Sequence, residues 1–324
     1  MWMRGFVAAA CLVAAFATGA PAAAQENWPQ RQVNVIVPFS AGGSTDLIAR
    51  ILTQHLQAKL NAPFVVENKG GAGGSIGTGL VAKAANDGYT LLVGTVSSSV
   101  INAFLYTRLP FDLEKDLEPV ALLATLPNLL IVNPKLPAKT VPELVAYLKA
   151  NPGKATFGSS GIGTSSHLSS VMFQGATGTS MTHVPFRSTN EVINSLIGGH
   201  IDLAIDSMTT AWPQAKEGTV RPLAVTTPKR SETAPDLPTI GETLQGFQAT
   251  AWQGLFAPAG TPRPILDKLS AEVKRILEMP EVVAQLKGLG AEPSPSTPSE
   301  FAEFLKSERI RWQEVVKASG ARID

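Results

Sequence analysis

Short segments with strand character alternate with amphipathic segments along most of the chain. Residues 33–37 are mostly β-branched and end at Pro38, which is typical of a buried strand. Residues 45–60 repeat leucine and isoleucine at helical spacing and predict a helix. Strands and helices in this order are typical of a parallel sheet with helices on both faces. The other elements expected in this half are a strand at 64–66, a helix at 76–85 and a strand at 89–94.

The middle of the chain repeats this alternation, and its end is mostly helical. No low-complexity linker separates the two α/β halves, so we expect two lobes that are joined by short strands and enclose a cleft. A length of 324 residues suits two lobes better than one core. Strands are expected at 129–132, 155–158, 182–185, 201–205, 220–226 and 252–257. Helices are expected at 141–150, 164–175, 190–197, 264–277, 280–286 and 299–318.

The first residues have the pattern of a secretory signal peptide. Arg4 precedes an apolar run from 5 to 20, and small residues follow up to Ala24. The run of roughly 16 residues is shorter than the about 20 that a membrane-spanning helix needs. We expect cleavage near Ala24 and a periplasmic protein, with a retained membrane anchor as the alternative. Lipid attachment at Cys11 is disfavoured because this cysteine lies in the middle of the run.

Charge and cysteine content exclude several kinds of partner. The chain has 27 basic and 26 acidic residues, and Arg4 is the only charged residue before Glu26, so the mature chain is about neutral. Without a basic block, we expect no nucleic-acid partner. Cys11 is the only cysteine and is lost with the signal peptide, which excludes disulfides and thiolate metal sites in the mature chain. We expect no cofactor.

Glycine and hydroxyl residues connect the first strand directly to the first helix, over residues 38–46. The unpaired N–H groups and the positive dipole end of a helix start form a site for an anion. Ser44 and Thr45 add hydroxyl donors at this position. Alternatively, Ser44, Thr45 or Asp46 only caps the helix, and both roles are compatible.

A second loop of this kind, residues 158–167, occupies the equivalent place in the second half. Two such loops can face each other across a cleft, and this pairing is more specific than either loop alone. A dinucleotide site is disfavoured because no acidic residue follows Gly163 at the expected distance of about 20 positions. A third glycine-rich stretch, residues 69–77, lacks the Gly-Lys-Ser/Thr ending of a phosphate loop. It is expected to bend the chain, with a wall contact in the cleft as a further role.

Catalysis finds little support in the sequence. Residues 73–77 match G-x-S-x-G, but a long polar stretch separates this serine from the preceding strand, unlike a nucleophile elbow. The four histidines show no metal-ligand spacing. His167 together with Ser159, Ser160 and Asp206 has the composition of a triad, although a helix-capping role explains His167 equally well. We expect no enzyme, with a hydrolase based on Ser160 and His167 as a rival interpretation.

Charged and aromatic residues near the strand ends complete the candidate site. Asp46 and Asp206 follow predicted strands, where ligands of α/β sheets bind, and each could contact the ligand or hold a loop. Arg187 is the best placed cation for a second acidic group on the ligand, or else a surface charge. Phe39 and Phe186 could stack on an organic ligand or only pack at the cleft mouth.

Ordered motifs over essentially the whole mature chain resemble those of the Bug family, the extracytoplasmic receptors of tripartite tricarboxylate transporters. The resemblance rests on PFSAGGSTD, VENKGGAGGSIG, VNPKLPAKTVPEL, FGSSGIGTSSHL, HVPFRS, GGHIDLAID and WQGLFAPAGTP. It implies a two-lobed, type II-like periplasmic binding-protein fold of the Venus flytrap kind. Domain one then comprises 25–124 and 253–324, and domain two comprises 125–252.

The same resemblance implies that both loops clamp a ligand carboxylate through amides, hydroxyls and ordered water. Family members often have Tyr-Lys-Gly where this chain has Phe186-Arg187-Ser188, and the planar fork of Arg187 favours a bidentate carboxylate. The expected ligand-binding residues are Phe39, Ser40, Ala41, Gly42, Gly43, Ser44, Thr45, Asp46, Thr95, Ser97, Ser159, Ser160, Gly161, Gly163, Thr164, Ser165, His167, Phe186, Arg187 and Asp206.

The function expected from these features is that of a monomeric receptor for a mono- or dicarboxylate, which it presents to membrane transporter subunits. A ligand sensor that docks on a histidine kinase is the alternative. The ligand stays open among a C4 dicarboxylate, citrate, an amino acid and an aromatic acid.

Overall fold

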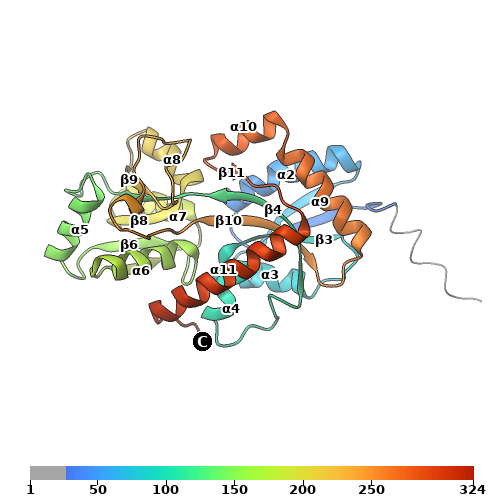
Figure 1. Cartoon of the computed structure of the whole chain (residues 1–324), viewed down its shortest axis with the longest axis horizontal. Helices are drawn as coiled ribbons and strands as arrows, with labels where there is room; N and C mark the ends of the chain where they lie inside the picture. The colour runs from blue at the N-terminus through green and yellow to red at the C-terminus, as the bar shows by residue number, and fades with distance from the viewer. Residues whose placement is uncertain (1–26) are drawn as a thin grey trace, which may run out of the picture.

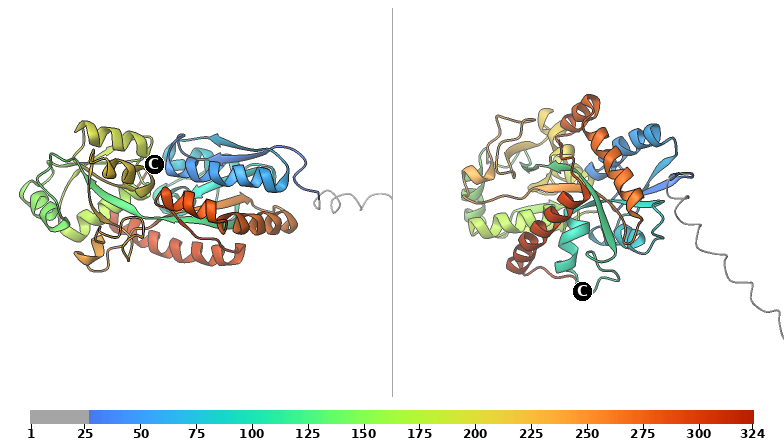
Figure 2. Two further views of the ribbon diagram at one scale, coloured as in Figure 1. Left: turned by 90° about the horizontal axis from the view of Figure 1, so that it is seen from above. Right: turned by 45° about the vertical axis from the view of Figure 1, so that its right-hand side comes forward.

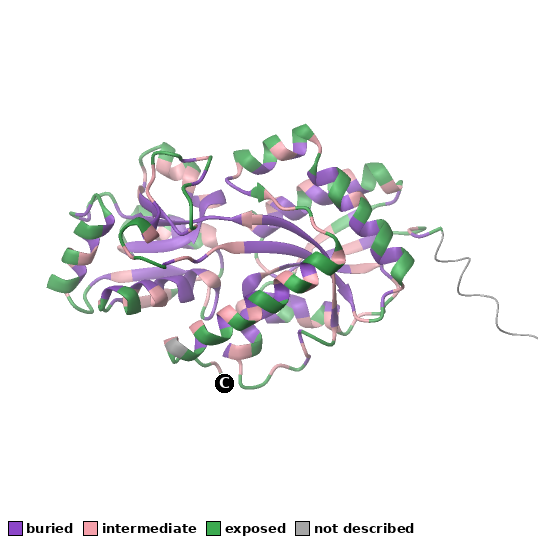
Figure 3. Ribbon diagram, viewed as in Figure 1, coloured by how far each residue is buried: buried purple, intermediate pink, exposed green. Residues whose placement is uncertain are grey.

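Two β-sheets, one in each of two lobes, organise residues 27–324, which are the residues described in this computed structural model (Figure 1). The expected signal peptide and Cys11 lie outside the described residues. Seen from above, the two lobes lie side by side (Figure 2). In both, the strands are largely buried and the helices bury one face (Figure 3). The protein thus has the α/β fold in two lobes that the sequence predicted.

The sheet of the first lobe is mixed rather than wholly parallel. Its order is β11-β4-β10-β3-β1-β2, and its parallel neighbours are the pairs β1–β2 and β1–β3. β10 runs antiparallel to both β3 and β4, because the chain returns along it from the second lobe. The strands are β1 (Val33–Val37), β2 (Phe64–Asn68), β3 (Thr90–Thr95), β4 (Leu117–Leu126), β10 (Ala251–Pro258) and β11 (Glu292–Pro293).

The sheet of the second lobe repeats this plan. Its order is β7-β6-β8-β5-β9, with β6 parallel to β7 and β8, and with β5 antiparallel to β8 and β9. The expectation of parallel sheets was therefore wrong for the strands next to the lobe junction. The strands are β5 (Asn128–Val132), β6 (Thr156–Ser159), β7 (Thr182–Pro185), β8 (Leu203–Ser207) and β9 (Arg221–Val225).

Helices cover the sheets and follow most of the strands. All helices and strands expected from the sequence are present, with ends shifted by at most a few residues. The sequence pattern missed β4, which has no alternation, and α8, which contains Pro213. It also missed the short elements η1, η2, α4, η3 and β11. The helices are α2 (Ser44–Leu60), η1 (Ala72–Gly74), α3 (Ser75–Ala82), η2 (Ser97–Ile101), α4 (Asn102–Leu105), α5 (Val141–Ala150), α6 (Ser165–Thr177), α7 (Thr189–Gly198), α8 (Met208–Lys216), η3 (Ile240–Glu242), α9 (Arg263–Leu277), α10 (Pro280–Gly288) and α11 (Pro298–Ser319).

The chain passes between the lobes along two neighbouring strands. β4 ends at Leu126 and β5 begins at Asn128, so one residue separates the two sheets here. The chain returns through β10, which pairs with β4 along its whole length (Figure 1). These crossing strands have ten and eight residues and are therefore longer than the short strands expected. The domain boundaries expected at 124/125 and 252/253 fall within them.

Apolar packing also joins the lobes. α11 extends from the first lobe along α6 of the second (Figure 1). Leu168 on α6 is fully buried in the same apolar cluster as Leu105 and Trp312 of the first lobe. The lobes therefore meet both at the strand junction and along these helices.

Candidate ligand-binding site

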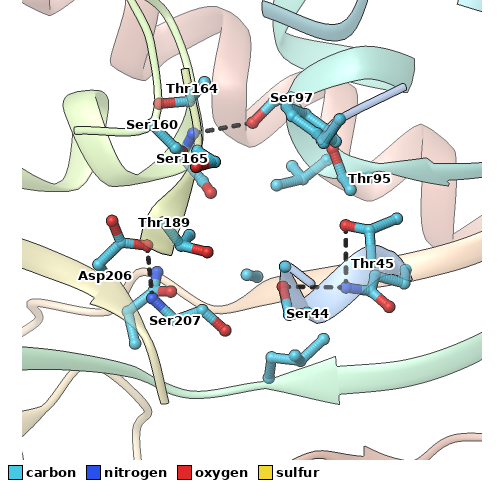
Figure 4. A pocket seen from close by; sticks show the side chains of 18 of the residues that line it. Ser44, Thr45, Thr95, Ser97, Ser160, Thr164, Ser165, Thr189, Asp206 and Ser207 are labelled. Atoms are coloured by element: carbon cyan, nitrogen blue, oxygen red, sulfur yellow. Dashed lines mark hydrogen bonds between the residues drawn. The ribbon is translucent and has the colours of Figure 1, made fainter. Parts of the chain in front are cut away.

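A cavity of about 60 Å³ lies between the lobes, next to the two crossing strands. In Figure 4, Ser44 and Thr45 of the first lobe lie opposite Asp206 and Ser207 of the second. Phe39, Gly43, Asn128 and Gln253 also contribute to its wall. Most of the lining side chains carry hydroxyl groups, and these are Ser40, Ser44, Thr45, Thr95, Ser97, Ser160, Thr164, Ser165, Ser188, Thr189 and Ser207.

The first loop presents the start of α2 to this cavity. Gly43 is the N-cap and has no side chain that could accept a hydrogen bond from the first-turn N–H groups. The structure therefore overturns the alternative in which Ser44, Thr45 or Asp46 caps the helix. Gly42 has a φ of 79°, and a Cβ atom there would lie 3.0 Å from Nδ2 of Asn190 on the second lobe. The positive φ thus favours glycine in this turn, and a side chain here would also require Asn190 to shift.

Asp46 holds this loop from behind and does not line the cavity. Its carboxylate accepts hydrogen bonds from Gly42 N–H (2.9 Å), Asn68 Nδ2 (3.0 Å) and Arg50 Nε (3.0 Å). Burial opposes ionisation, but the bonds from Arg50, Gly42 and Asn68 outweigh it and hold the pKa of Asp46 below its usual value. Of the two roles considered for Asp46, the geometry favours holding the loop.

The second loop is fastened internally and also to the other lobe. Thr164 caps α6, because its Oγ1 accepts a bond from His167 N–H (3.5 Å) and donates one to the Gly161 carbonyl (2.7 Å). The Ser160 N–H donates to Ser166 Oγ (3.1 Å). The Ser165 N–H donates to Ser97 Oγ in the first lobe (2.8 Å). The hydroxyl groups at this helix start thus keep the loop in one shape.

Two stacked histidines lie behind the second loop. The rings of His167 and His183 are 4.1 Å apart, and Phe157 stacks on His183 at 4.7 Å. His167 Nδ1 accepts a hydrogen bond from Gly163 N–H (3.1 Å), and His183 Nε2 lies 2.6 Å from Ser159 Oγ. Burial lowers the pKa of both to about 4, and for His183 the neighbouring His167 adds to this, so both imidazoles are neutral at pH 7. The histidines support the loop and do not line the cavity.

The geometry does not assemble a hydrolase from these groups. Ser160 Oγ is bonded to Ser166 Oγ, and His167 Nδ1 is occupied by Gly163, so the Ser160–His167 pair of the rival interpretation is not formed. Ser159 does meet His183, but its side chain is fully buried and its hydroxyl donates to the Gly161 carbonyl (3.0 Å). Within residues 27–324, no group of His, Cys, Asp or Glu residues is arranged to hold a metal ion.

Asp206 is buried at the end of β8, where it lines the cavity. Its Oδ1 accepts a hydrogen bond from Ser207 N–H (2.7 Å), and its Oδ2 has no partner among the described residues. Burial raises the pKa of Asp206 to about 7, which the bond from Ser207 offsets only in part. Asp206 therefore has an unused hydrogen-bonding atom within the wall of the cavity.

The remaining predicted residues divide into two sets. Gly161, Phe186 and Arg187 line a second cavity of about 830 Å³, which shares Phe39, Ser40 and Ser160 with the first. The glycine-rich stretch 70–74 also lines this second cavity. The predicted residues that line neither cavity are Ala41, Gly42, Asp46, Ser159, Gly163 and His167.

Several cavity residues were not found from the sequence. Ser188 and Thr189 open α7, and a third strand–helix junction after β7 was the signal that could have identified them. Ser207 directly follows Asp206 at the end of β8 and was expected only as an unnamed neighbour of Asp206. Asn128 and Gln253 lie in the crossing strands, and no local pattern marks them.

No helix in the described part of the chain is long and apolar enough to span a bilayer.

Two α/β lobes, joined by paired crossing strands around a small polar cavity, define the class of solute-binding proteins. Residues 48–321 match the family described as the tripartite tricarboxylate transporter family receptor. The chain therefore belongs to this family, as the sequence motifs predicted. BugT of Bordetella pertussis is 35% identical over 313 residues, which cover 96% of each chain.

Solved structures show the same relationship. The R. palustris protein Rpa4515 with adipate has a TM-score of 0.89 at 35% identity, over 91% of this chain and all of that one. MatC from Rhodopseudomonas palustris with bound malate has a TM-score of 0.85 at 36% identity, over 89% of this chain and all of that one. The periplasmic binding protein BugD has a TM-score of 0.86 at 37% identity, over 91% and 99%. BugD is described as a periplasmic binding protein, and this chain, which matches the receptor family, is a solute-binding protein of the same type.

Proposed function

We propose that this protein is a monomeric periplasmic receptor that captures a small organic carboxylate and presents it to membrane subunits of a tripartite tricarboxylate-type transporter. One observation carries the proposal: the starts of α2 and α6, from different lobes, face the same cavity. The open N–H groups of α2 and the hydroxyls of Ser44 and Thr45 are donors for an anion on one side. At the start of α6, the hydroxyl group of Ser165 supplies a donor on the other side.

Unpaired polar atoms around the cavity support a polar ligand. Buried side-chain atoms usually have a hydrogen-bond partner. Within the described residues, Oγ1 of Thr189, Oδ2 of Asp206, Oγ of Ser207 and Oε1 of Gln253 are buried without one, and all four residues line the cavity. The hydroxyls of Thr189 and Ser207 can donate to carboxylate oxygens of a ligand, whereas Oε1 of Gln253 and an ionised Oδ2 of Asp206 need a donor such as a ligand hydroxyl.

Ligand size and charge are proposed from the two cavities. The first, at about 60 Å³, is smaller than the roughly 150 Å³ cavity that holds benzene in another protein, and suits one carboxylate with a short carbon chain. A second carboxylate can extend into the larger cavity, where Arg187 is the cation proposed to receive it. The malate and adipate complexes of similar proteins support a dicarboxylate.

A thermal-shift screen of the purified protein tests this function. Malate, adipate, citrate, glutamate and benzoate represent the classes of acid, and sodium chloride at equal ionic strength is the control. At 100 times its Kd, a ligand stabilises the fold by about 2.7 kcal/mol, which is a readily measured shift in Tm. No shift with any acid at millimolar concentration would contradict the proposal. Labelling of the protein by a serine-reactive probe would instead favour a hydrolase.

Transport is tested separately from binding. Deletion of the receptor should abolish uptake of the labelled acid in cells that retain the membrane subunits, and the wild-type chain should restore it. A receptor that binds the acid but leaves its uptake unchanged would favour the sensor alternative.

A further inference from the structure

Asp206 is an unusual residue for a cavity that receives an anion. Among the described residues that line the first cavity, it is the only one with an ionisable side chain. The residue is 2% exposed, its Oδ1 is bonded to the Ser207 N–H, and its Oδ2 has no partner among residues 27–324. A carboxylate in this position would lie in the same small space as the carboxylate of the ligand.

No cation on the neighbouring elements compensates for Asp206. Strands β5 and β6, which flank β8, contain no ionisable side chain. Three helices pack on β8, and their ionisable residues are His167 on α6, Glu191 on α7 and Lys216 on α8, none of which lines the cavity. His167 is neutral at pH 7, and Glu191 and Lys216 are exposed.

Among the described residues of the opposite lobe, none that lines the cavity is a cation. On α2, Arg50 is paired with Asp46, and neither residue lines the cavity. Two like charges that share a dry site without a counter-ion cannot both remain ionised, so one of them takes up a proton. A protonated carboxyl group is an O–H donor, whereas an ionised one can only accept hydrogen bonds. Protonation of Asp206 would thus replace a repulsion by a hydrogen bond.

We propose that Asp206 is protonated in the ligand-bound receptor, so that the protein takes up one organic acid together with one proton. The proton comes from water and stays on the Asp206 carboxyl group, which donates it in a hydrogen bond to an oxygen atom of the ligand. The ligand class follows: an organic acid that offers an oxygen acceptor at Asp206, rather than an amino acid, whose ammonium group would require ionised Asp206. This inference rests on the proposed function, because it requires an anionic ligand.

The pKa of Asp206, which burial raises to about 7, sets the pH range of the test. Isothermal titration calorimetry with malate and adipate should be carried out from pH 6.5 to 8.5, where both acids are ionised, at constant ionic strength. Two buffers with different ionisation enthalpies report the protons bound for each ligand. We expect Kd to rise about 25-fold over this range, with uptake approaching one proton at pH 8.5.

Matched variants assign the proton to Asp206. In Asp206→Asn, which keeps the shape of the side chain and always has a donor, the rise in Kd should shrink to less than about twofold, without proton uptake. Glu191→Gln removes the acidic group of α7 and should keep the full pH dependence. In the unliganded wild type, the ¹³C resonance of the Asp206 carboxyl carbon should titrate near pH 7.

The possible outcomes separate this inference from the proposed function. Binding of either acid with a constant Kd and no proton uptake overturns the inference and leaves the receptor function intact. Affinity that rises with pH, or tight binding of glutamate that Asp206→Asn abolishes, also overturns it, in favour of an ionised Asp206 that binds an ammonium group. If neither acid nor any other carboxylate binds at any pH, the receptor function fails, and this inference fails with it.

Discussion

The backbone N–H of Ser165, the first residue of α6, donates a 2.8 Å hydrogen bond to Oγ of Ser97 on the other lobe. Both residues line the cavity, so the bond closes the cavity wall where the lobes meet. It exists only while the lobes are together. Because a ligand bound between lobes selects the closed arrangement, contacts of this kind contribute to its apparent affinity.

Ser97→Ala should therefore weaken ligand binding without unfolding either lobe. The loss of a neutral hydrogen bond of about 1 kcal/mol corresponds to a rise in Kd of about fivefold. Isothermal titration calorimetry measures the change. Ser99→Ala is the control, because Ser99 is equally buried in η2 but bonds only within its own lobe. Equal affinities of Ser97→Ala and wild type would show that the bond does not contribute to closure.

Gly163→Ala should prevent the lobes from closing fully. A Cβ atom on Gly163 would overlap the side chain of Leu105 on the other lobe. Overpacking costs about 1–3 kcal/mol, so Kd should rise by roughly 5- to 150-fold. Gly153→Ala is the matched control, because its φ of 71° gives the same backbone strain with no atom within 4 Å. If Leu105→Ala in the Gly163→Ala background does not restore affinity, the steric explanation is wrong.

Asp46→Ala should lower both the ligand affinity and the stability of the first lobe. It removes the acceptor that anchors Gly42, Asn68 and Arg50, and hydrogen bonds to a charged group contribute about 1.5–3 kcal/mol each. Urea unfolding and calorimetry measure the two effects. Arg50→Gln, which removes only a half-exposed partner, should cost less than about 1 kcal/mol. Wild-type affinity in Asp46→Ala would show that the loop keeps its shape without this carboxylate.

Asp206→Asn should stabilise the unliganded protein increasingly as the pH rises. The pKa of Asp206 is about 7 in the fold against 3.8 for an ordinary aspartate, so its contribution to stability is fully present below pH 3.8 and is lost as the pH rises through 7. The asparagine variant has no group that titrates here, so it does not lose this stability as the pH rises. Its free energy of unfolding relative to wild type should thus increase between pH 4 and 7, by at most about 1.4 kcal/mol per pH unit. A difference that is constant with pH would contradict the raised pKa.

The pair His167 and His183 should make the free energy of unfolding depend on pH in the opposite direction to Asp206. With pKa values of about 4 against the ordinary 6.5, its contribution to stability is present above pH 6.5 and is lost as the pH falls through 4. Urea unfolding of Asp206→Asn across this range isolates the effect, because that background removes the opposing group. Adding His183→Gln should reduce the slope, by up to about 1.4 kcal/mol per pH unit. An unchanged slope would show that His183 does not titrate in this window.

Local pattern predicted the elements and both loops that start helices at the cavity. The β-branched run at 33–37 and the apolar stripe of α2 depend on neighbours within a few residues, and so do the glycines of 38–46. The same holds for α6 and the loop before it. These elements can be predicted from a single sequence because the spacing of apolar side chains along a helix or strand is a local property.

The tertiary structure alone decided which groups meet. Parallel pairing of β6 with β7 brings His183 beside Phe157. The residues next to either strand in the sequence do not indicate this contact. Lobe closure joins Ser97 to Ser165, 68 positions away, and Gln253 donates to Thr45 over 208 positions. The raised pKa of Asp206 comes from its burial, and none of the described residues that line the cavity is a cation. Strand register, lobe contact and desolvation depend on neighbours in space. The sequence alone therefore determined which loops could bind an anion, and only the tertiary structure decided which residues surround them.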